Sequence, residues 1–121
     1  CVGGGVITSQ ATPLVKELVS MKNATVVSTL MGLSGYPASD QRFLGMLGTY
    51  GQEAANRAVQ DCDCLLALGM RFDDRVIGVP EGFAPKAQII HVDIDPAEIG
   101  KNIGCDIPIV GDVSCILAET R

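Results

Sequence analysis

The charged side chains best suited to chemistry lie within residues 71–75, which read Arg71-Phe72-Asp73-Asp74-Arg75. Two arginines flank two carboxylates directly after an apolar run. A guanidinium fork matches phosphate and carboxylate groups, and neighbouring carboxylates can hold it in position. The pattern therefore predicts an anion-binding site, with a solvated loop of mutually neutralising charges as the alternative. A metal site is the weaker interpretation, because adjacent Asp side chains diverge in an extended chain and no third ligand is evident.

A second set of polar side chains, His91, Asp93 and Asp95, alternates with Val92 and Ile94. Period-two geometry places the three polar residues on one side of an extended segment. An aspartate at the carboxyl end of a strand can accept hydrogen bonds from a ribose or an adenine edge. For Asp95 the alternative is a helix N-cap. His91 is the only histidine, and we interpret it as a packed core residue rather than a catalytic one.

Three consecutive glycines, Gly3-Gly4-Gly5, lack Cβ atoms and would let a ligand approach the backbone N–H groups, although a plain tight turn uses the same residues. The dinucleotide fingerprint G-x-G-x-x-G is incomplete, because Thr8 occupies its third glycine position. Residues 22–28 also contain no Asp or Glu that could bind a ribose. An NAD-binding unit is therefore disfavoured. The sequence has no Gly-x-Ser-x-Gly elbow and no Walker A lysine, so it favours a binding module over a nucleophilic catalyst.

The composition excludes several classes of protein. The 121 residues are 47% apolar and 19% charged, with a formal charge of −5, which is too apolar for a disordered chain. No basic cluster is present, so a nucleic-acid partner is not expected. No apolar run approaches the ~20 residues of a membrane span, and the first residues lack the order of a signal peptide. We therefore expect neither a membrane nor a nucleic acid as partner.

The length suits one domain over residues 1–121. Cys1-Val2 before the glycines resembles the tail of a strand, so we expect a piece excised from a longer chain. The sequence has five cysteines, an odd number, and no two of them form a C-x-x-C pair. Reduced thiols in a cytoplasmic protein are therefore the expectation, and a disulfide framework or a zinc site is disfavoured.

Short apolar runs alternate with helix-like segments along the chain. Strands are predicted at residues 25–30, 64–69, 88–94 and 107–111, and helices at residues 11–19, 54–59, 95–100 and from 112 onwards. Continuous apolar runs are typical of strands covered on both faces. The pattern predicts an α/β fold, namely a three-layer Rossmann-like domain with a mostly parallel sheet of five or six strands. In such a sheet the polar and glycine-rich clusters, which directly follow the apolar runs, meet at one edge.

Taken together, the motifs resemble the central domain of the large catalytic subunit of acetolactate synthase, a thiamine-diphosphate enzyme. They are Gly3-Gly4-Gly5, Thr29-Leu30-Met31-Gly32-Leu33 with Tyr36-Pro37, Leu44-Gly45-Met46, residues 69–78, His91 to Asn102, and Val110-Gly111-Asp112. The resemblance covers nearly the whole chain. The runs at residues 29–33 and 71–76 are the most specific to this family. The family often has a histidine after the Leu-Gly-Met run, where this chain has Leu47.

In that family the central domain binds FAD in an extended pose, with no net redox in the reaction. The resemblance implies FAD contacts at Gly4, Thr29, Leu30, Met31, Gly32, Leu44, Gly45, Met46, Gly69, Met70, Arg71, Phe72, Asp73, Asp93, Ile94, Asp112 and Val113. The flavin would lie toward residues 29–32 and 44–46, the diphosphate toward Arg71, and the adenosine toward Asp93 and Asp112. Met46, Asp74 and Arg75 would border the substrate channel, where Arg75 would receive a 2-oxoacid carboxylate.

The resemblance also implies a parent enzyme with three domains that joins pyruvate to a second pyruvate or to 2-oxobutyrate with loss of CO₂, in branched-chain amino-acid biosynthesis. Thiamine diphosphate and Mg²⁺ would be bound by the flanking domains, whose signature residues are not in this sequence, so this domain alone is expected to be inactive. The expected partners are those flanking domains, further copies in a homodimer or tetramer, and a small regulatory subunit. Two alternatives remain: the central domain of another thiamine-diphosphate carboligase or oxidase, and a stand-alone nucleotide-binding module.

Overall fold

Five strands and one short bridging segment form the parallel sheet of this computed structural model, which describes residues 1–48, 51–72, 83–100 and 104–119. The strands are β1 (Val26–Ser28), β2 (Phe43–Met46), β3 (Cys64–Leu68), β4 (Gln88–Asp93) and β5 (Ile107–Val110). β1 pairs with β2, and β4 pairs with both β3 and β5, in parallel throughout. Val2 bridges Ser28 and Leu68, also in parallel, and so joins the two groups in the order β2-β1-Val2-β3-β4-β5. The predicted α/β fold with a parallel sheet is confirmed.

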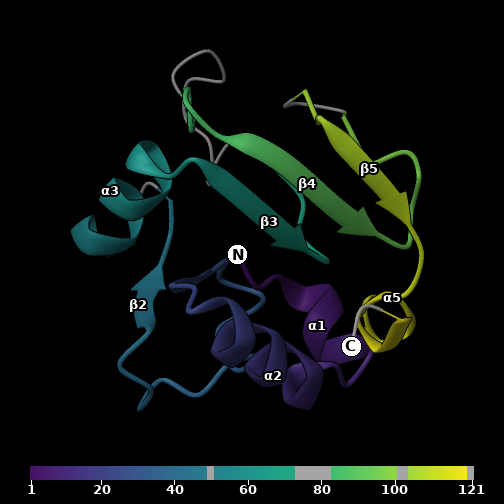
Figure 1. The fold of residues 1–121 in the computed structure, drawn as a ribbon, viewed down its shortest axis with the longest axis horizontal. Coiled ribbons are helices and arrows are strands. Elements are labelled where there is room, and N and C mark those ends of the chain that lie inside the picture. Colours follow the sequence, from purple (N-terminus) through teal and green to yellow (C-terminus); the bar gives the residue numbers. More distant parts are fainter. Residues whose placement is uncertain (49–50, 73–82, 101–103, 120–121) are drawn as a thin grey trace.

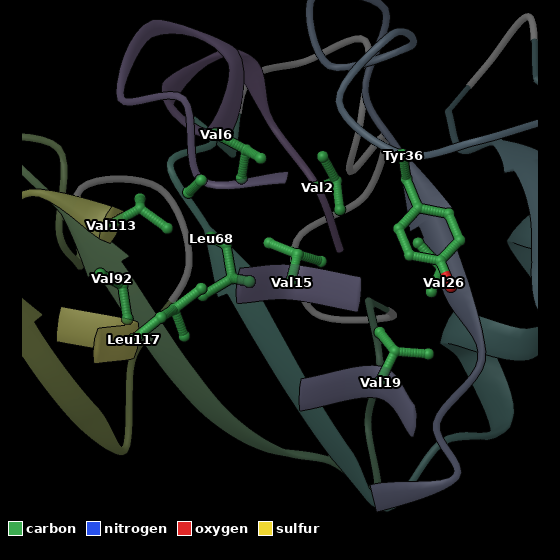
Figure 2. Packing of buried hydrophobic residues seen from close by; sticks show 11 residues of the cluster. Val2, Val6, Val15, Val19, Val26, Tyr36, Leu68, Val92, Val113 and Leu117 are labelled. Carbon is green, nitrogen blue, oxygen red and sulfur yellow. The ribbon is translucent and has the colours of Figure 1, made fainter. Parts of the chain in front are cut away.

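Each face of the sheet is covered by its own hydrophobic core, because neighbouring strand residues point to opposite sides. Helices α1 (Gly4–Thr8), α2 (Thr12–Lys22) and α5 (Val113–Glu119) lie together in Figure 1, and α3 (Glu53–Asp61) lies apart from them near β2. Figure 2 shows the first core, in which side chains of α1, α2 and α5 meet Leu68 and Val92 of the sheet. The second core contains Val59 of α3 with Leu65 and Ile89. These are the three layers that the continuous apolar runs predict.

Three of the predicted helices form. α2 begins with Pro13 in its first turn and ends at Asn23, whose left-handed backbone (φ 51°) allows its N–H to bond the Val19 carbonyl. α3 extends the predicted stretch by a residue or two at each end. α5 starts after Asp112, whose Oδ2 accepts a hydrogen bond from the Cys115 N–H at 3.3 Å. Among the described helices, none is long and apolar enough to cross a membrane.

The helix predicted at residues 95–100 is wrong, because this stretch forms only turns. The expected cap contact is nevertheless present, since Asp95 Oδ1 accepts from the Ala97 N–H at 2.9 Å. Gly100 then adopts a left-handed backbone with φ 73°. A residue in that conformation typically ends a helix. Here Gly100 ends the segment after its first turn, so no longer helix forms.

Two elements were missed by the sequence patterns. α1 occupies the glycine-rich stretch where a tight turn was the simpler expectation, since glycine is a poor helix former. β2 occupies residues interpreted only as a binding loop. It is four residues long, contains Gly45 at φ 110° and pairs with β1 in an irregular register, so it has no clear strand pattern.

Candidate functional site

The clusters that the sequence singles out lie along one rim of the sheet. All the strands are parallel, so their carboxyl ends share one edge, and residues 3–5, 29–32, 69–72, 93–95 and 111–112 follow those ends. Six segments spaced about 4.8 Å apart give this carboxyl rim a length of roughly 24 Å. Ligands of open α/β sheets bind outside the carboxyl ends of the strands. The carboxyl rim is therefore the candidate site.

A pocket of about 320 Å³ opens over the β3-β4-β5 part of this rim, and we call it the rim pocket. Its lining residues are Gly5, Thr8, Ser9, Gly69, Arg71, Asp93, Ile94, Asp95, Glu98, Gly111, Asp112 and Val113. Six of the predicted contact residues meet there, namely Gly69, Arg71, Asp93, Ile94, Asp112 and Val113. Thr8, Ser9 and Glu98 were not predicted. Their only signal is that they lie a few residues beyond the Gly-rich and strand-end motifs.

The two predicted adenosine-side carboxylates are fixed by the backbone around them. Asp93 is 8% exposed, and its Oδ1 accepts a hydrogen bond from the Asp95 N–H at 2.9 Å. The carboxylate of Asp112 caps α5 through Oδ2. Each of these interactions engages one oxygen atom of a carboxylate. Between them Ile94 is 71% exposed, so it offers an apolar surface at the mouth of the rim pocket.

Charge in the rim pocket is mostly negative. Among the described residues, Arg71 is its one basic lining residue, against Asp93, Asp95, Glu98 and Asp112. Carboxylates accept hydrogen bonds from hydroxyl groups, and a guanidinium binds an anion. In the part of the chain that the structure describes, no group of three or more His, Cys, Asp or Glu side chains is arranged to hold a metal ion. The pocket therefore suits a ligand with hydroxyl groups at one end and an anionic group near Arg71.

The glycines of the rim pack mainly against one another. The Gly5 N–H donates to the Gly69 carbonyl at 2.9 Å, and a Cβ on Gly5 would lie 2.7 Å from Gly69 Cα. A Cβ on Gly3 would overlap the Gly69 carbonyl oxygen. The expectation that Gly3 and Gly5 open the backbone to a ligand therefore needs correction, since their missing side chains admit the end of β3. At Gly4 the space is wider, and an added Cβ would first meet Met31 Cβ, at 3.3 Å.

Residues 29–32 follow β1 on the adjacent part of the rim. The Thr29 hydroxyl oxygen accepts from the Gly32 N–H at 3.2 Å, which closes a tight turn. The turn leaves Leu30 and Met31 59% and 74% exposed. Large apolar side chains at such exposure offer a surface that a ligand or another protein segment can cover.

Leu44, Gly45 and Met46 lie in β2 at the far edge of the sheet and do not line the rim pocket. The Met46 N–H donates to Gln52 Oε1 at 2.8 Å, and the Met46 carbonyl accepts from the Gln52 N–H. Any contact of these residues with a ligand of the rim pocket requires a ligand long enough to span the sheet.

Met70 and Phe72 are 2% and 3% exposed and belong to the second core. The Phe72 ring meets the His91 ring edge-on, with 5.0 Å between centroids. Their side chains thus point away from the rim, and only their backbone can border a ligand. The predicted residues Asp73, Asp74 and Arg75 lie outside the described residues.

Comparison with known proteins identifies the family. The family described as thiamine pyrophosphate enzyme, central domain, matches residues 1–120. Acetolactate synthase of Mycobacterium bovis is 52% identical over 118 residues, which are 98% of this chain and 19% of that protein. The probable acetolactate synthase large subunit of Methanocaldococcus jannaschii is 51% identical over 97% of this chain and 20% of its own length. The acetolactate synthase large subunit of Haemophilus influenzae is 45% identical over 98% of this chain and 21% of its own length.

This chain thus spans about a fifth of the length of these relatives. Its fold agrees with the match, since the layers and the parallel sheet are those of an α/β domain. The chain therefore belongs to the thiamine pyrophosphate enzyme family as a central domain, and it is similar over nearly its whole length to acetolactate synthase large subunits.

Proposed function

We propose that this chain binds FAD in an extended pose along the carboxyl rim. The observation that carries the proposal is the rim pocket itself. Predicted contact residues from three separate strand ends line one pocket, namely Gly69 and Arg71, residues 93–94, and residues 112–113. A volume of about 320 Å³ is at the small end for a cofactor pocket, so it suits one part of a dinucleotide rather than the whole.

The ADP part of FAD fits the charges of the rim pocket. Ribose hydroxyls are hydrogen-bond donors, and the carboxylates of Asp93 and Asp112 are acceptors at the ends of β4 and β5. Arg71, at the end of β3, is the cation that would balance the diphosphate. The order of these groups along the sheet sets the order of the ligand: adenosine over β4 and β5, diphosphate over β3.

The flavin part would then continue past Gly4 toward the segments that follow β1 and β2. Leu30 and Met31 offer an exposed apolar surface there. Leu44, Gly45 and Met46 would meet the flavin from the far edge, which is reachable because the rim is roughly 24 Å long. FAD would serve as a structural element of the domain, with no net redox chemistry in the reaction.

We further propose that the chain is one domain of a three-domain acetolactate synthase, a transferase of the cytoplasm. The parent would condense two 2-oxoacids with loss of CO₂, and thiamine diphosphate with Mg²⁺, bound by the flanking domains, would supply the carbanion chemistry. Met46, Asp74 and Arg75 would form one wall of the substrate channel. The domain alone would be inactive, and the parent would assemble as a homodimer or tetramer with a small regulatory subunit. Sequence identity of 45% to 52% to acetolactate synthases supports the assignment of the parent enzyme as an acetolactate synthase.

Titration of the protein with FAD, followed by flavin fluorescence, tests the proposal. Fluorescence should change saturably, and ADP should compete for the same site. Arg71→Ala should weaken FAD binding by about tenfold or more, because it removes a charge-assisted bond to the diphosphate. Arg57→Ala is the matched control, since Arg57 is an exposed arginine of α3 that pairs with Glu53 instead. Absence of saturable FAD binding, or equal loss in both variants, would refute FAD as the ligand of the rim pocket.

A further inference from the structure

His91 lies inside the protein, two residues before Asp93 of the rim pocket. It is fully buried, on β4, opposite Ala67 of β3. Its Nε2 lies 2.8 Å from the Met70 carbonyl oxygen and 3.7 Å from Asp93 Oδ2. The imidazole therefore touches the segment that leaves β3 and also approaches the carboxylate at the end of β4.

The contacts of His91 assign its tautomer. A carbonyl oxygen only accepts hydrogen bonds, so Nε2 carries the proton at the 2.8 Å contact with Met70. Within the described residues, Nδ1 is buried without a hydrogen-bond partner, so the 2.8 Å contact of Nε2 is the ring's hydrogen bond there. The edge of Phe72 packs against the ring at 5.0 Å between centroids and restricts its orientation.

An apolar side chain would fill the same space without leaving a buried nitrogen unpaired. What the imidazole adds is the Nε2–H group and its two oxygen neighbours. Met70 stands between Gly69 and Arg71, and both of these line the rim pocket, as does Asp93. The buried imidazole therefore contacts the backbone next to Arg71, on the predicted diphosphate side, and approaches Asp93, on the predicted adenosine side.

We propose that His91 is a positioning residue for the rim pocket. Through its Nε2–H group it fixes the Met70 carbonyl, and with it the backbone that carries Arg71, and it keeps the second oxygen of Asp93 turned toward β3. Its effect on FAD rests on the proposed function, whereas its effect on the backbone does not.

The ligand-free test uses nuclear magnetic resonance on the protein and needs no FAD. A long-range ¹H–¹⁵N spectrum of the imidazole should show the Nε2–H tautomer. His91→Leu should speed amide hydrogen exchange at Asp95, whose N–H is held by Asp93 Oδ1, by about tenfold or more. Ile89→Val is the matched control, because Ile89 is buried in the second core on the same strand and does not line the rim pocket. An Nδ1–H tautomer, or equal acceleration in the control, would overturn the proposal.

The ligand test compares FAD affinity in three variants. His91→Leu should weaken binding by about tenfold, the size of one lost positioning hydrogen bond. His91→Gln should stay within about threefold of the original protein, because its carboxamide N–H can take the place of Nε2–H. Ile89→Val should leave the affinity unchanged even if it lowers the melting temperature. If His91→Leu does not fold, the rescue by His91→Gln and the tautomer decide the question.

The outcomes separate the two proposals. If the unaltered protein does not bind FAD, the proposed function fails, and the tautomer and exchange data alone judge His91. If FAD binds and His91→Leu and His91→Gln bind as tightly as the original, the positioning role fails while the proposed function stands. Equal weakening in both His91 variants and in the Ile89→Val control would reduce His91 to an ordinary core residue.

Discussion

The two edges of the sheet each contain a hollow, and the two hollows differ in chemistry. The rim pocket at the carboxyl edge has a volume of about 320 Å³ and is lined by five charged side chains, Arg71, Asp93, Asp95, Glu98 and Asp112. The hollow at the amino edge is larger, about 600 Å³, and is lined mainly by apolar residues of α2, α3, β1 and β3 together with Cys1, Cys62 and Cys64. We call it the amino-edge hollow. Of these two hollows, size alone would favour this one as the binding site.

What separates the edges is where polar groups converge. At the carboxyl rim, side chains from three strand ends line one space. At the amino edge the polar group that stands out is the amino group of Cys1, which donates to the Leu66 carbonyl at 2.6 Å, as a backbone N–H of the sheet would. The amino-edge hollow is thus bounded by ladder hydrogen bonds and mainly apolar side chains, with the exposed residues Lys22, Asn23 and Asp63 also in its lining. It resembles an opening into the core more than a site built for a polar ligand.

The largest expected effect concerns this amino group in a chain whose first residue is Cys1, since a preceding residue would turn the amine into a peptide N–H. Burial lowers the pKa of the Cys1 amine to about 5, from an ordinary value of 8.0. The unfolded chain therefore binds a proton between pH 8 and pH 5 that the folded chain does not, so stability is complete above pH 8 and falls as the pH drops toward 5. Three units of pKa correspond to about 4 kcal/mol. Urea unfolding of a chain that begins at Cys1, measured at several pH values, should show that the free energy of unfolding falls as the pH drops from 8 to 5.

Acetylation of the Cys1 amine is the matched control. It removes the charge and leaves an N–H that can still bond Leu66, while every other titrating group is common to both chains. The difference in unfolding free energy between the two chains should therefore be small at pH 8 and large at pH 5. A difference that does not change with pH would mean that the amine is not buried, and the contrast between the edges would weaken.

The next effect concerns the glycine contact at the carboxyl rim. Gly69→Ala combines a left-handed backbone, φ 61°, with a Cβ placed 2.6 Å from Gly5 Cα, so backbone strain and overlap add. We expect a loss of about 3 kcal/mol in the free energy of unfolding. Denaturant unfolding measures it. Such a loss would show that close backbone packing holds the carboxyl rim together.

Gly100→Ala separates strain from overlap. Gly100 has a similar backbone, φ 73°, but a Cβ there would meet none of the described residues within 4 Å. It should cost about 1 kcal/mol, from strain alone. Equal losses at both positions would show that the contact between Gly5 and Gly69 contributes little.

The sequence predicts the architecture well because the apolar runs are strong and local. Residues 64–68 and 88–93 are strands covered on both faces, as a continuous apolar pattern requires. It also predicts which strand ends carry polar residues, so Asp93 and Asp112 could be assigned to one edge before any coordinates. Parallel pairing then brings them together without further information.

The rest depends on contacts that no local pattern contains. Gly5 could be recognised as unusual, but its partner Gly69 lies 64 positions away, and only the fold shows that their backbones touch. The stretch at residues 95–100 has a helix cap and a helix stop in its sequence, and only the fold shows that turns form between them. Likewise, the direction of Met70 and Phe72 into the second core follows from their place after a buried strand, not from their types.

The smallest expected effect tests whether a rim carboxylate serves the fold and the ligand separately. Asp112→Ala removes the α5 cap and should cost about 1 kcal/mol of stability, whereas Asp112→Asn keeps a capping oxygen and should cost little. For FAD the two variants should behave alike. In Asp112→Asn an amide nitrogen replaces the carboxylate oxygen that faces the pocket, so affinity should fall by about threefold to tenfold in both. Thermal unfolding and FAD titration of the two variants measure the two effects independently. The alternative outcome is that FAD affinity follows stability, with weak binding in the alanine variant and normal binding in the asparagine variant. Asp112 would then act on the ligand only by ordering α5. The rim would in that case bind FAD through fewer charged groups than its lining suggests.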